Sequence, residues 1–268
     1  MEAVLAPRSS GTRTHSQPLR TSFERPLRID RTSETALHLV PTSDRPKVVP
    51  IPVAEARSER AIRILNVTVA SIGLVAAAPV MLMVAALIKL TSRGPVFYSQ
   101  TRVGIDRRWR ENRSDNRRVY DHGGKPFKMY KFRSMRVDAE ADGRAVWAQK
   151  QDPRQTLVGG FLRKTRLDEL PQLYNVLRGD MNIVGPRPER PSIFADLRDN
   201  IPDYPIRQRV RPGITGWAQI NQAYDCCLDD VRNKVQYDLE YLRRRSLGLD
   251  LRIMTMTIPV MLLRKGSQ

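Results

Sequence analysis

The longest apolar segment of the chain runs from Ile64 to Ile88 without a charged side chain. As a helix it would be about 37 Å long, enough to cross a bilayer with some tilt. Pro79 near its middle removes a backbone hydrogen bond and kinks a helix. Basic residues flank both ends, so the positive-inside rule gives no orientation; they are Arg57, Arg60, Arg63, Lys89 and Arg93. Three interpretations remain open: a spanning helix, a re-entrant helix that bends at Pro79, and a buried helix of a soluble domain.

Further along the chain the pattern predicts shorter elements. Residues 88–100 read as a helix end, a Gly-Pro turn and a short strand, and the alternation in 127–133 indicates a second strand. A helix is expected to begin near Pro171, because proline is tolerated in a first turn. The apolar segment Leu251 to Leu263 is too short to cross a membrane and suits either an interfacial helix or a helix packed on the core.

Two regions lack such periodicity. Residues 1–58 are rich in Arg, Ser, Thr and Pro and are expected to be a disordered basic tail, and no cleavable signal peptide is expected before Ile64. Residues 105–126 carry many arginines and predict a solvated, flexible insertion.

The formal net charge of +18 favours an anionic partner, either nucleic acid, acidic lipid headgroups or a phosphorylated substrate. The cysteines are the adjacent Cys226 and Cys227, which cannot easily bridge each other or supply a spaced zinc site. A reducing compartment and no structural metal are therefore expected.

Asp168 and Glu169 stand just before Pro171. A carboxylate at a helix start should stay ionised beside the helix dipole. An ionised aspartate can attack phosphorus, and a neighbouring glutamate is a hard oxygen ligand suited to Mg²⁺. The alternative is that the pair merely caps the helix.

Two rigid loops that carry arginines favour a catalytic role of the acidic pair over a helix cap. Gly185-Pro-Arg-Pro188 restricts Arg187, and a Pro/Gly-shaped loop follows Arg211. Guanidinium groups clamp phosphate in two-point contacts. On the predicted strand, Lys128 or Lys131 with Arg133 could hold a phosphate, although the polar side chains of such strands usually face water. Constrained arginines beside an acidic pair suit a diphosphate better than a nucleic acid, which binds many loosely held cations.

In order along the chain, these strings resemble the bacterial sugar transferase family, the monotopic phosphoglycosyl transferases, in its short exopolysaccharide-type form. The resemblance covers about Arg60 to Leu263, and the ordered set is far more specific than any single string. The strings are Gly94-Pro-Val-Phe-Tyr98, Tyr130-Lys-Phe-Arg-Ser-Met135, Asp152-Pro-Arg154, Leu162-Arg-Lys-Thr-Arg-Leu-Asp-Glu-Leu-Pro-Gln-Leu173, Gly179-Asp-Met181, Val184-Gly-Pro-Arg-Pro-Glu-Arg-Pro191, Arg211-Pro-Gly-Ile-Thr-Gly-Trp-Ala-Gln219, Tyr237-Asp-Leu239 and Leu249-Asp-Leu251.

The resemblance implies transfer of a sugar-1-phosphate from a nucleotide diphosphate sugar, expected to be a UDP-sugar, to polyprenyl (undecaprenyl) phosphate. Asp168 would be the nucleophile of a covalent aspartyl intermediate, nucleoside monophosphate would leave, and Glu169 would bind Mg²⁺. Such transfer initiates exopolysaccharide, capsule or other glycan assembly. The residues expected to bind substrate are Lys131, Arg133, Arg166, Arg187, Arg211, Asp238 and Asp250.

The resemblance also implies an α+β, mainly helical fold with a short β element. It makes a re-entrant membrane helix over 59–93, bent at Pro79, the preferred topology, followed by a catalytic domain over 94–268 with interfacial amphipathic helices. That domain would lie on the cytoplasmic face of the bacterial inner membrane, in contact with anionic lipids. Asn66 and Ala78 replace the family's usual Asp and Ser, and Glu240 and residues 224–227 also depart from its pattern, where sugar or nucleotide choice could differ.

A non-catalytic membrane-surface adaptor that binds anionic lipids is the alternative function. No nucleic-acid partner is expected, and a homodimer is a possibility that the sequence leaves open. The sequence does not specify the sugar, the nucleotide or the pathway.

Overall fold

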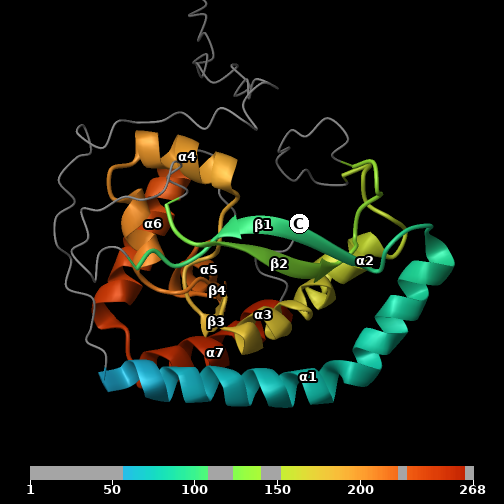
Figure 1. Cartoon of the computed structure of the whole chain (residues 1–268), viewed down its shortest axis with the longest axis horizontal. Coiled ribbons are helices and arrows are strands. Elements are labelled where there is room, and N and C mark those ends of the chain that lie inside the picture. The colour runs from blue at the N-terminus through green and yellow to red at the C-terminus, as the bar shows by residue number, and fades with distance from the viewer. Residues whose placement is uncertain (1–56, 108–122, 140–151, 223–227, 263–268) are drawn as a thin grey trace, which may run out of the picture.

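The computed structural model describes residues 57–107, 123–139, 152–222 and 228–262 (Figure 1). Within these ranges the chain is mainly helical and has two small sheets, one of β1 and β2 and one of β3 and β4. The predicted α+β, mainly helical class with a short β element is confirmed. The basic tail up to residue 56, residues 108–122 of the predicted insertion, and Cys226 with Cys227 lie outside the described residues.

The apolar segment forms one long helix, α1 (Arg57–Thr91), with Pro79 inside it. Within the described ranges it is the helix long and apolar enough to cross a membrane. Figure 1 shows that α1 runs beneath the other elements and then turns upward along the side that carries α2. A proline removes one hydrogen bond of the helix and is a common cause of such a bend.

Both ends of α1 pack against the rest of the protein. Near its start, Ile62, Asn66 and Ala70 are buried at four-residue spacing, which places them on one helical face. Ala70 belongs to a core cluster with residues of β2 and α3, whereas Val84 and Ile88 belong to another cluster with Phe132 and Leu162. The bend therefore lets one helix follow the surface of a single folded unit.

Hydrogen bonds fix the first half of α1 in place. The guanidinium of Arg63 donates to the carbonyl oxygens of Val176 and Leu177, at the end of α3. Asn66 is fully buried, donates to the Ile62 carbonyl and accepts a hydrogen bond from the backbone N–H of Ile183. Asn66, which stands where the family usually has Asp, thus satisfies both its amide N–H and its amide oxygen with backbone groups.

The sheet nearest to the candidate site is an antiparallel pair, β1 (Phe97–Val103) and β2 (Pro126–Phe132), in which Tyr98 faces Lys131. Both strands were predicted. After β2 come α2 (Gly159–Lys164), the 3₁₀ helix η3 (Leu167–Glu169) and α3 (Gln172–Arg178). Asn175 of α3 donates to the Lys128 carbonyl and accepts from the Tyr130 N–H, so its amide holds α3 against β2.

The second half of the chain encloses the largest core cluster, which Phe194, Tyr204, Val235 and Leu239 help to form. Its sheet is the parallel pair β3 (Asn182–Val184) and β4 (Gly213–Thr215). The helices around it are α4 (Pro191–Asn200), the 3₁₀ helix η4 (Tyr204–Arg209), α5 (Trp217–Asn221), α6 (Leu228–Arg244) and α7 (Leu247–Leu262).

Helix α7 shows how the two expectations for the C-terminal apolar segment combine. Ile253 is fully buried in the core, whereas Leu251 and Ile258 are exposed. One face of the helix therefore packs on the core, and the other leaves apolar side chains outward. Contact of that face with a membrane stays a prediction.

We expect Asn66→Ala to destabilise the protein by about 1–3 kcal/mol, because it leaves the Ile183 N–H unsatisfied at a buried site. Thermal unfolding in lipid nanodiscs measures the effect. Asn66→Asp keeps an acceptor oxygen, and Thr68→Ala changes an exposed position of the same helix. An Asn66→Ala protein as stable as Thr68→Ala would contradict the proposed anchoring.

Candidate active site

Glu169 lies at the centre of a buried ionic cluster. Its Oε1 is 2.7 Å from Arg187 Nη2 and 3.0 Å from Lys131 Nζ, and its Oε2 is 3.8 Å from Arg166 Nη1. Asp168 and Glu169 are only 7% and 8% exposed. Of the predicted site residues, the structure thus brings together the acidic pair, Lys131, Arg166 and Arg187.

The cluster gathers side chains from separate parts of the chain. Lys131 comes from β2, which Asn175 holds against α3. The acidic pair lies on η3, whose preceding residue, Arg166, has a left-handed backbone with φ of 56°. A left-handed conformation at a non-glycine residue costs roughly 1–2 kcal/mol. The rest of the structure outweighs this cost, and the turn sets the side chains of the acidic pair beside the cations.

The two carboxylates have opposite electrostatic surroundings. Burial is the largest influence on Asp168 and raises its pKa to about 6, with the Glu169 charge acting in the same direction and Lys131 opposing it. Burial also disfavours the charged form of Glu169, but the three cations around it outweigh that effect and hold its pKa well below the ordinary value. Glu169 is therefore ionised at neutral pH, and Asp168, with a pKa of about 6, is mostly ionised there yet still basic.

This result refines the expectation for Asp168. The residue is largely ionised at neutral pH, as predicted, but a helix dipole does not explain it. Asp168 lies in a three-residue 3₁₀ helix, and α3 begins only at Gln172. Burial instead shifts the pKa of Asp168 upward.

A second buried ion pair holds the Arg187 loop. Arg207 and Asp238 are each 1% exposed, and Arg207 Nε lies 2.6 Å from Asp238 Oδ2. Arg207 Nη2 also donates to the backbone oxygen of Arg187 at 3.2 Å. Burial raises the pKa of Asp238, and the Arg207 charge opposes that shift. Asp238 therefore acts on the site through Arg207 and the backbone of Arg187.

The same loop is fastened at its glycine and proline. Gly185 N–H donates to the Thr215 carbonyl, and Gly213 N–H donates to the Pro186 carbonyl. A Cβ on Gly185 would lie 2.5 Å from the Arg211 carbonyl oxygen, so only glycine fits this approach of the loop to β4. The rigidity predicted from Gly-Pro-Arg-Pro thus has a structural cause.

Three predicted binding residues have contacts away from the cluster. Arg133 donates to the Ser92 and Arg93 carbonyls, just beyond the end of α1. Arg211 donates to the Gly179 carbonyl at 3.0 Å. Asp250 accepts a hydrogen bond of 2.8 Å from the Tyr241 hydroxyl, and burial raises its pKa to about 6. In this structure the three side chains join elements of the fold, and their binding roles stay predictions.

Arg207 and Asn175 are the positioning residues that the sequence did not single out. Arg207 is one of several arginines in its segment, and Asn175 is a polar residue inside a predicted helix. Their roles depend on partners 31 and 45 residues away along the chain. No local spacing signals such contacts.

A metal ion would have few protein ligands here. Among the described residues, no three His, Cys, Asp or Glu side chains gather at one place. Mg²⁺, however, is commonly held by one or two carboxylates together with substrate phosphates and water. Glu169 Oε1 is engaged by two cations, whereas Oε2 has the 3.8 Å contact with Arg166. The acidic pair therefore fits a Mg²⁺ ion that shares its ligands with a phosphorylated substrate.

Comparison with known proteins gives relatives over the same region. The chain is 41% identical over 204 residues to an Aeromonas hydrophila UDP-N-acetylgalactosamine-undecaprenyl-phosphate N-acetylgalactosaminephosphotransferase, covering 76% of this chain and 44% of that protein. It is 42% identical over 195 residues to the Escherichia coli UDP-glucose:undecaprenyl-phosphate glucose-1-phosphate transferase, covering 72% of this chain and 38% of that protein. The chain thus spans less than half the length of these two relatives.

A shorter relative is covered more fully. The exopolysaccharide production protein ExoY of Rhizobium meliloti is 36% identical over 219 residues, which cover 76% of this chain and 87% of that protein. The sequence profile of the family described as bacterial sugar transferase matches residues 57–264, from the start of α1 to just beyond the end of α7. The chain belongs to the bacterial sugar transferase family.

Proposed function

We propose that this protein transfers a sugar-1-phosphate from a nucleotide diphosphate sugar to undecaprenyl phosphate, with Asp168 as a covalent nucleophile. The observation that carries the proposal is the contrast within the acidic pair. One buried carboxylate has a raised pKa, and its neighbour is held by cations. The names of the relatives supply the substrate classes, a UDP-sugar and undecaprenyl phosphate. Such a transfer would begin the assembly of an exopolysaccharide or related glycan.

In the first half-reaction an oxygen of the Asp168 carboxylate attacks the phosphorus that bears the sugar. A new P–O bond forms to Asp168, the P–O bond to the nucleoside monophosphate breaks, and that group leaves with the electron pair. A carboxylate of higher pKa is a better nucleophile as long as it stays ionised. Lys131 and Arg187 supply positive charge where phosphate oxygens would gather, which stabilises the developing charge.

In the second half-reaction a phosphate oxygen of undecaprenyl phosphate attacks the same phosphorus. The P–O bond to Asp168 breaks and the carboxylate is regenerated, so no proton or further reactant is needed. The soluble donor and the lipid acceptor can then use one set of cations in turn. Binding the two substrates in turn suits a buried site that has only a few cations to neutralise phosphate groups.

We propose that Mg²⁺ assists this reaction, with Glu169 as its ligand from the protein. When bound, the ion would neutralise charge on the donor diphosphate. Glu169 remains ionised at any working pH because the pKa of its carboxyl is held well below the ordinary value.

We propose the re-entrant topology for α1, with the catalytic domain on the cytoplasmic face of the inner membrane. Its support is that the two halves of α1, before and after Pro79, pack on the same folded unit through Ala70 and through Val84 with Ile88. A helix that crossed a bilayer would put its ends on opposite sides. Basic residues at both ends and the net charge of +18 also favour one anionic membrane surface.

The membrane-surface adaptor remains the rival. Lipid binding requires exposed basic residues, whereas burying two adjacent carboxylates among cations is costly without a further use. The buried pair therefore favours the enzyme.

Asp168→Asn should lower the release of nucleoside monophosphate by at least about 10³-fold, because an amide cannot form the phosphosugar bond. UDP-glucose and UDP-N-acetylgalactosamine with undecaprenyl phosphate and Mg²⁺ are the first substrates to test. Asp138→Asn is the matched control, since Asp138 is exposed and pairs only with Arg136 among the contacts described. Near-normal turnover by Asp168→Asn would exclude this nucleophile, and no release by the wild type with any UDP-sugar would favour the adaptor.

The pH profile of kcat/KM should fall on the acid side with an apparent pKa of about 6, because protonated Asp168 cannot attack. Lys131 lowers the pKa of Asp168, so Lys131→Met should move this limb to higher pH, whereas Lys131→Arg should leave it nearly in place. An acid limb that does not move in Lys131→Met would contradict the electrostatic account of Asp168.

Removing the Arg207–Asp238 pair should reduce kcat by about tenfold or more, because the Arg187 loop loses its support. Loss of one partner alone leaves a buried unpaired charge, so the double variant Arg207→Met with Asp238→Leu is the better test. Thermal unfolding measures its stability separately. A stable double variant with full kcat would show that the pair does not position Arg187.

Labelling from one side decides the topology. After Cys226 and Cys227 are replaced by serine, single cysteines at Ser58 and Arg93 should react alike with a membrane-impermeant maleimide in sealed inverted vesicles. Labelling of only one of the two positions would refute the re-entrant helix. Asp199→Cys, in an exposed part of α4, serves as the control for the side of the catalytic domain.

A further inference from the structure

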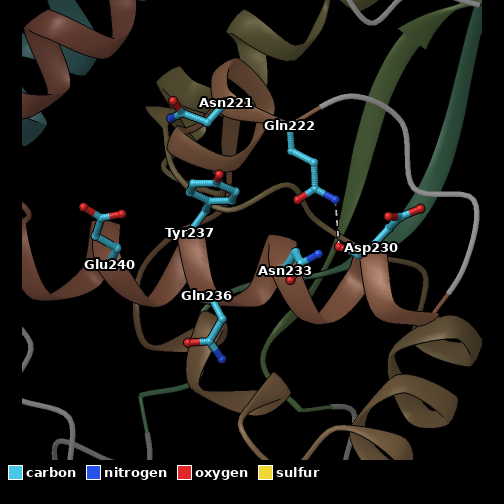
Figure 2. A pocket seen from close by; sticks show the side chains of 7 residues that line it. All are labelled: Asn221, Gln222, Asp230, Asn233, Gln236, Tyr237 and Glu240. Carbon is cyan, nitrogen blue, oxygen red and sulfur yellow. Dashed lines mark hydrogen bonds between the residues drawn. The ribbon is translucent and has the colours of Figure 1, made fainter.

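A pocket of about 390 Å³ lies between α5 and one side of α6, and the catalytic cluster does not use it. Figure 2 shows Gln222, after the end of α5, directed at Asp230 of α6, and Tyr237 pointing from α6 toward α5. The α6 side of the pocket contains Asn233, Gln236 and Tyr237, whose spacing of three and four residues places them on one face of a helix. The outer face of a helix usually bears charged side chains that point into water, but this face of α6 lines the pocket.

The chemistry of the lining is unusual for this protein. Four amides and a phenol line the pocket together with Asp230 and Glu240, and no lysine or arginine is among the described residues that do so. The whole chain has 46 lysines and arginines in 268 residues. A site for a phosphate or a nucleotide would need cations, so the lining disfavours an anionic ligand.

Of the two carboxylates in the lining, Glu240 is already paired. Glu240 Oε2 accepts a 3.0 Å hydrogen bond from Trp217 Nε1, and its Oε1 lies 2.7 Å from Arg244 Nη1. Its charge is thus already matched. Apart from Asp230, what remains is a set of neutral donors and acceptors, and such a lining suits hydroxyl groups, which can both give and receive hydrogen bonds.

The walls of the pocket are held in place by the fold. Asn221 Nδ2 donates to the Trp217 carbonyl at 2.8 Å, which fixes this side chain at the end of α5. Gln222 Nε2 donates to the backbone oxygen of Asp230 at 2.8 Å and ties the end of α5 to α6. On the opposite side of α6, Val235 and Leu239 are buried in the main core. The α5 side of the pocket and the backbone of α6 are therefore preformed, so a ligand would lose little binding energy to ordering them.

We propose that this pocket binds an uncharged carbohydrate, with the Tyr237 ring against an apolar face of the sugar and the amides on its hydroxyl groups. An aromatic body with hydrogen-bonding neighbours suits a ligand that has both kinds of surface. Asp238, which reaches the Arg187 loop through Arg207, is buried on the core side of α6, whereas the pocket lies along the other side of the same helix. The sugar in this pocket is thus distinct from the one on the attacked phosphate, and the proposal goes beyond the transferase function.

The test uses the full chain in lipid nanodiscs and saturation-transfer NMR with maltotriose, lactose and chitotriose as probes. The wild type should bind at least one of them, and Asn233→Ala with Gln236→Ala should weaken that binding about tenfold through the loss of two hydrogen bonds. Arg232→Ala, an exposed position on the same helix, should bind as the wild type does. Asp168→Asn should also keep full saccharide binding, so failure of the transferase proposal would leave this result unaffected.

Three results would overturn the proposal. They are no binding of any of these saccharides to the wild type, equal binding by the Asn233→Ala/Gln236→Ala protein, and displacement of the saccharide by uridine monophosphate. The last would place the sugar in the donor site and not in the pocket on α6.

Discussion

The structure depends most on the ionic cluster around Glu169. A carboxylate that is 8% exposed cannot remain charged without nearby cations, and Lys131 and Arg187 meet it at 3.0 and 2.7 Å. Because these cations come from β2 and from the loop after β3, the cluster joins parts of the chain that are distant in sequence. Burial raises the pKa of the neighbouring Asp168 to about 6, with the Glu169 charge acting in the same direction and Lys131 and Arg187 opposing it. The cluster thus joins the fold around Glu169, and burial at the same place gives Asp168 its basicity.

The long apolar helix is tied to the strand that carries Lys131 of this cluster. Helix α1 passes under the domain, and its first half is fixed by Arg63 and Asn66, while its last turns pack on Phe132 and Leu162. Arg133, one residue beyond β2, donates to the carbonyls that follow α1. The strand that carries Lys131 is therefore tied to the end of the apolar helix. In the proposed topology this link sets the depth of the acidic pair relative to the lipid headgroups.

Local pattern was enough to predict the long apolar helix, the first two strands, the helix after Pro171 and the apolar C-terminal segment. The Gly-Pro turn before β1, the alternation of β2 and the Gly-Pro-Arg-Pro loop each have a short-range cause. Resemblance to a family then selected Lys131, Asp168, Glu169 and Arg187 from many charged residues. The contacts of Arg133, Arg211 and Asp250 could not be predicted, because a basic or acidic residue in a string of motifs looks the same whether it meets a ligand or a backbone carbonyl. Arg207 and Asn175 were missed for a related reason, since their partners are distant in sequence. The amide-lined pocket on α6 depends on how α5 packs and has no signature in the sequence.

The central claim is that Asp168 carries the phosphosugar between two separate half-reactions. Intact-protein mass spectrometry after rapid mixing with UDP-sugar and Mg²⁺, without lipid acceptor, tests it most directly. The account predicts a mass increase of one sugar phosphate, mapped by peptide analysis to Asp168, that disappears when undecaprenyl phosphate is added. No adduct in an active protein, or an adduct on another residue, would contradict it.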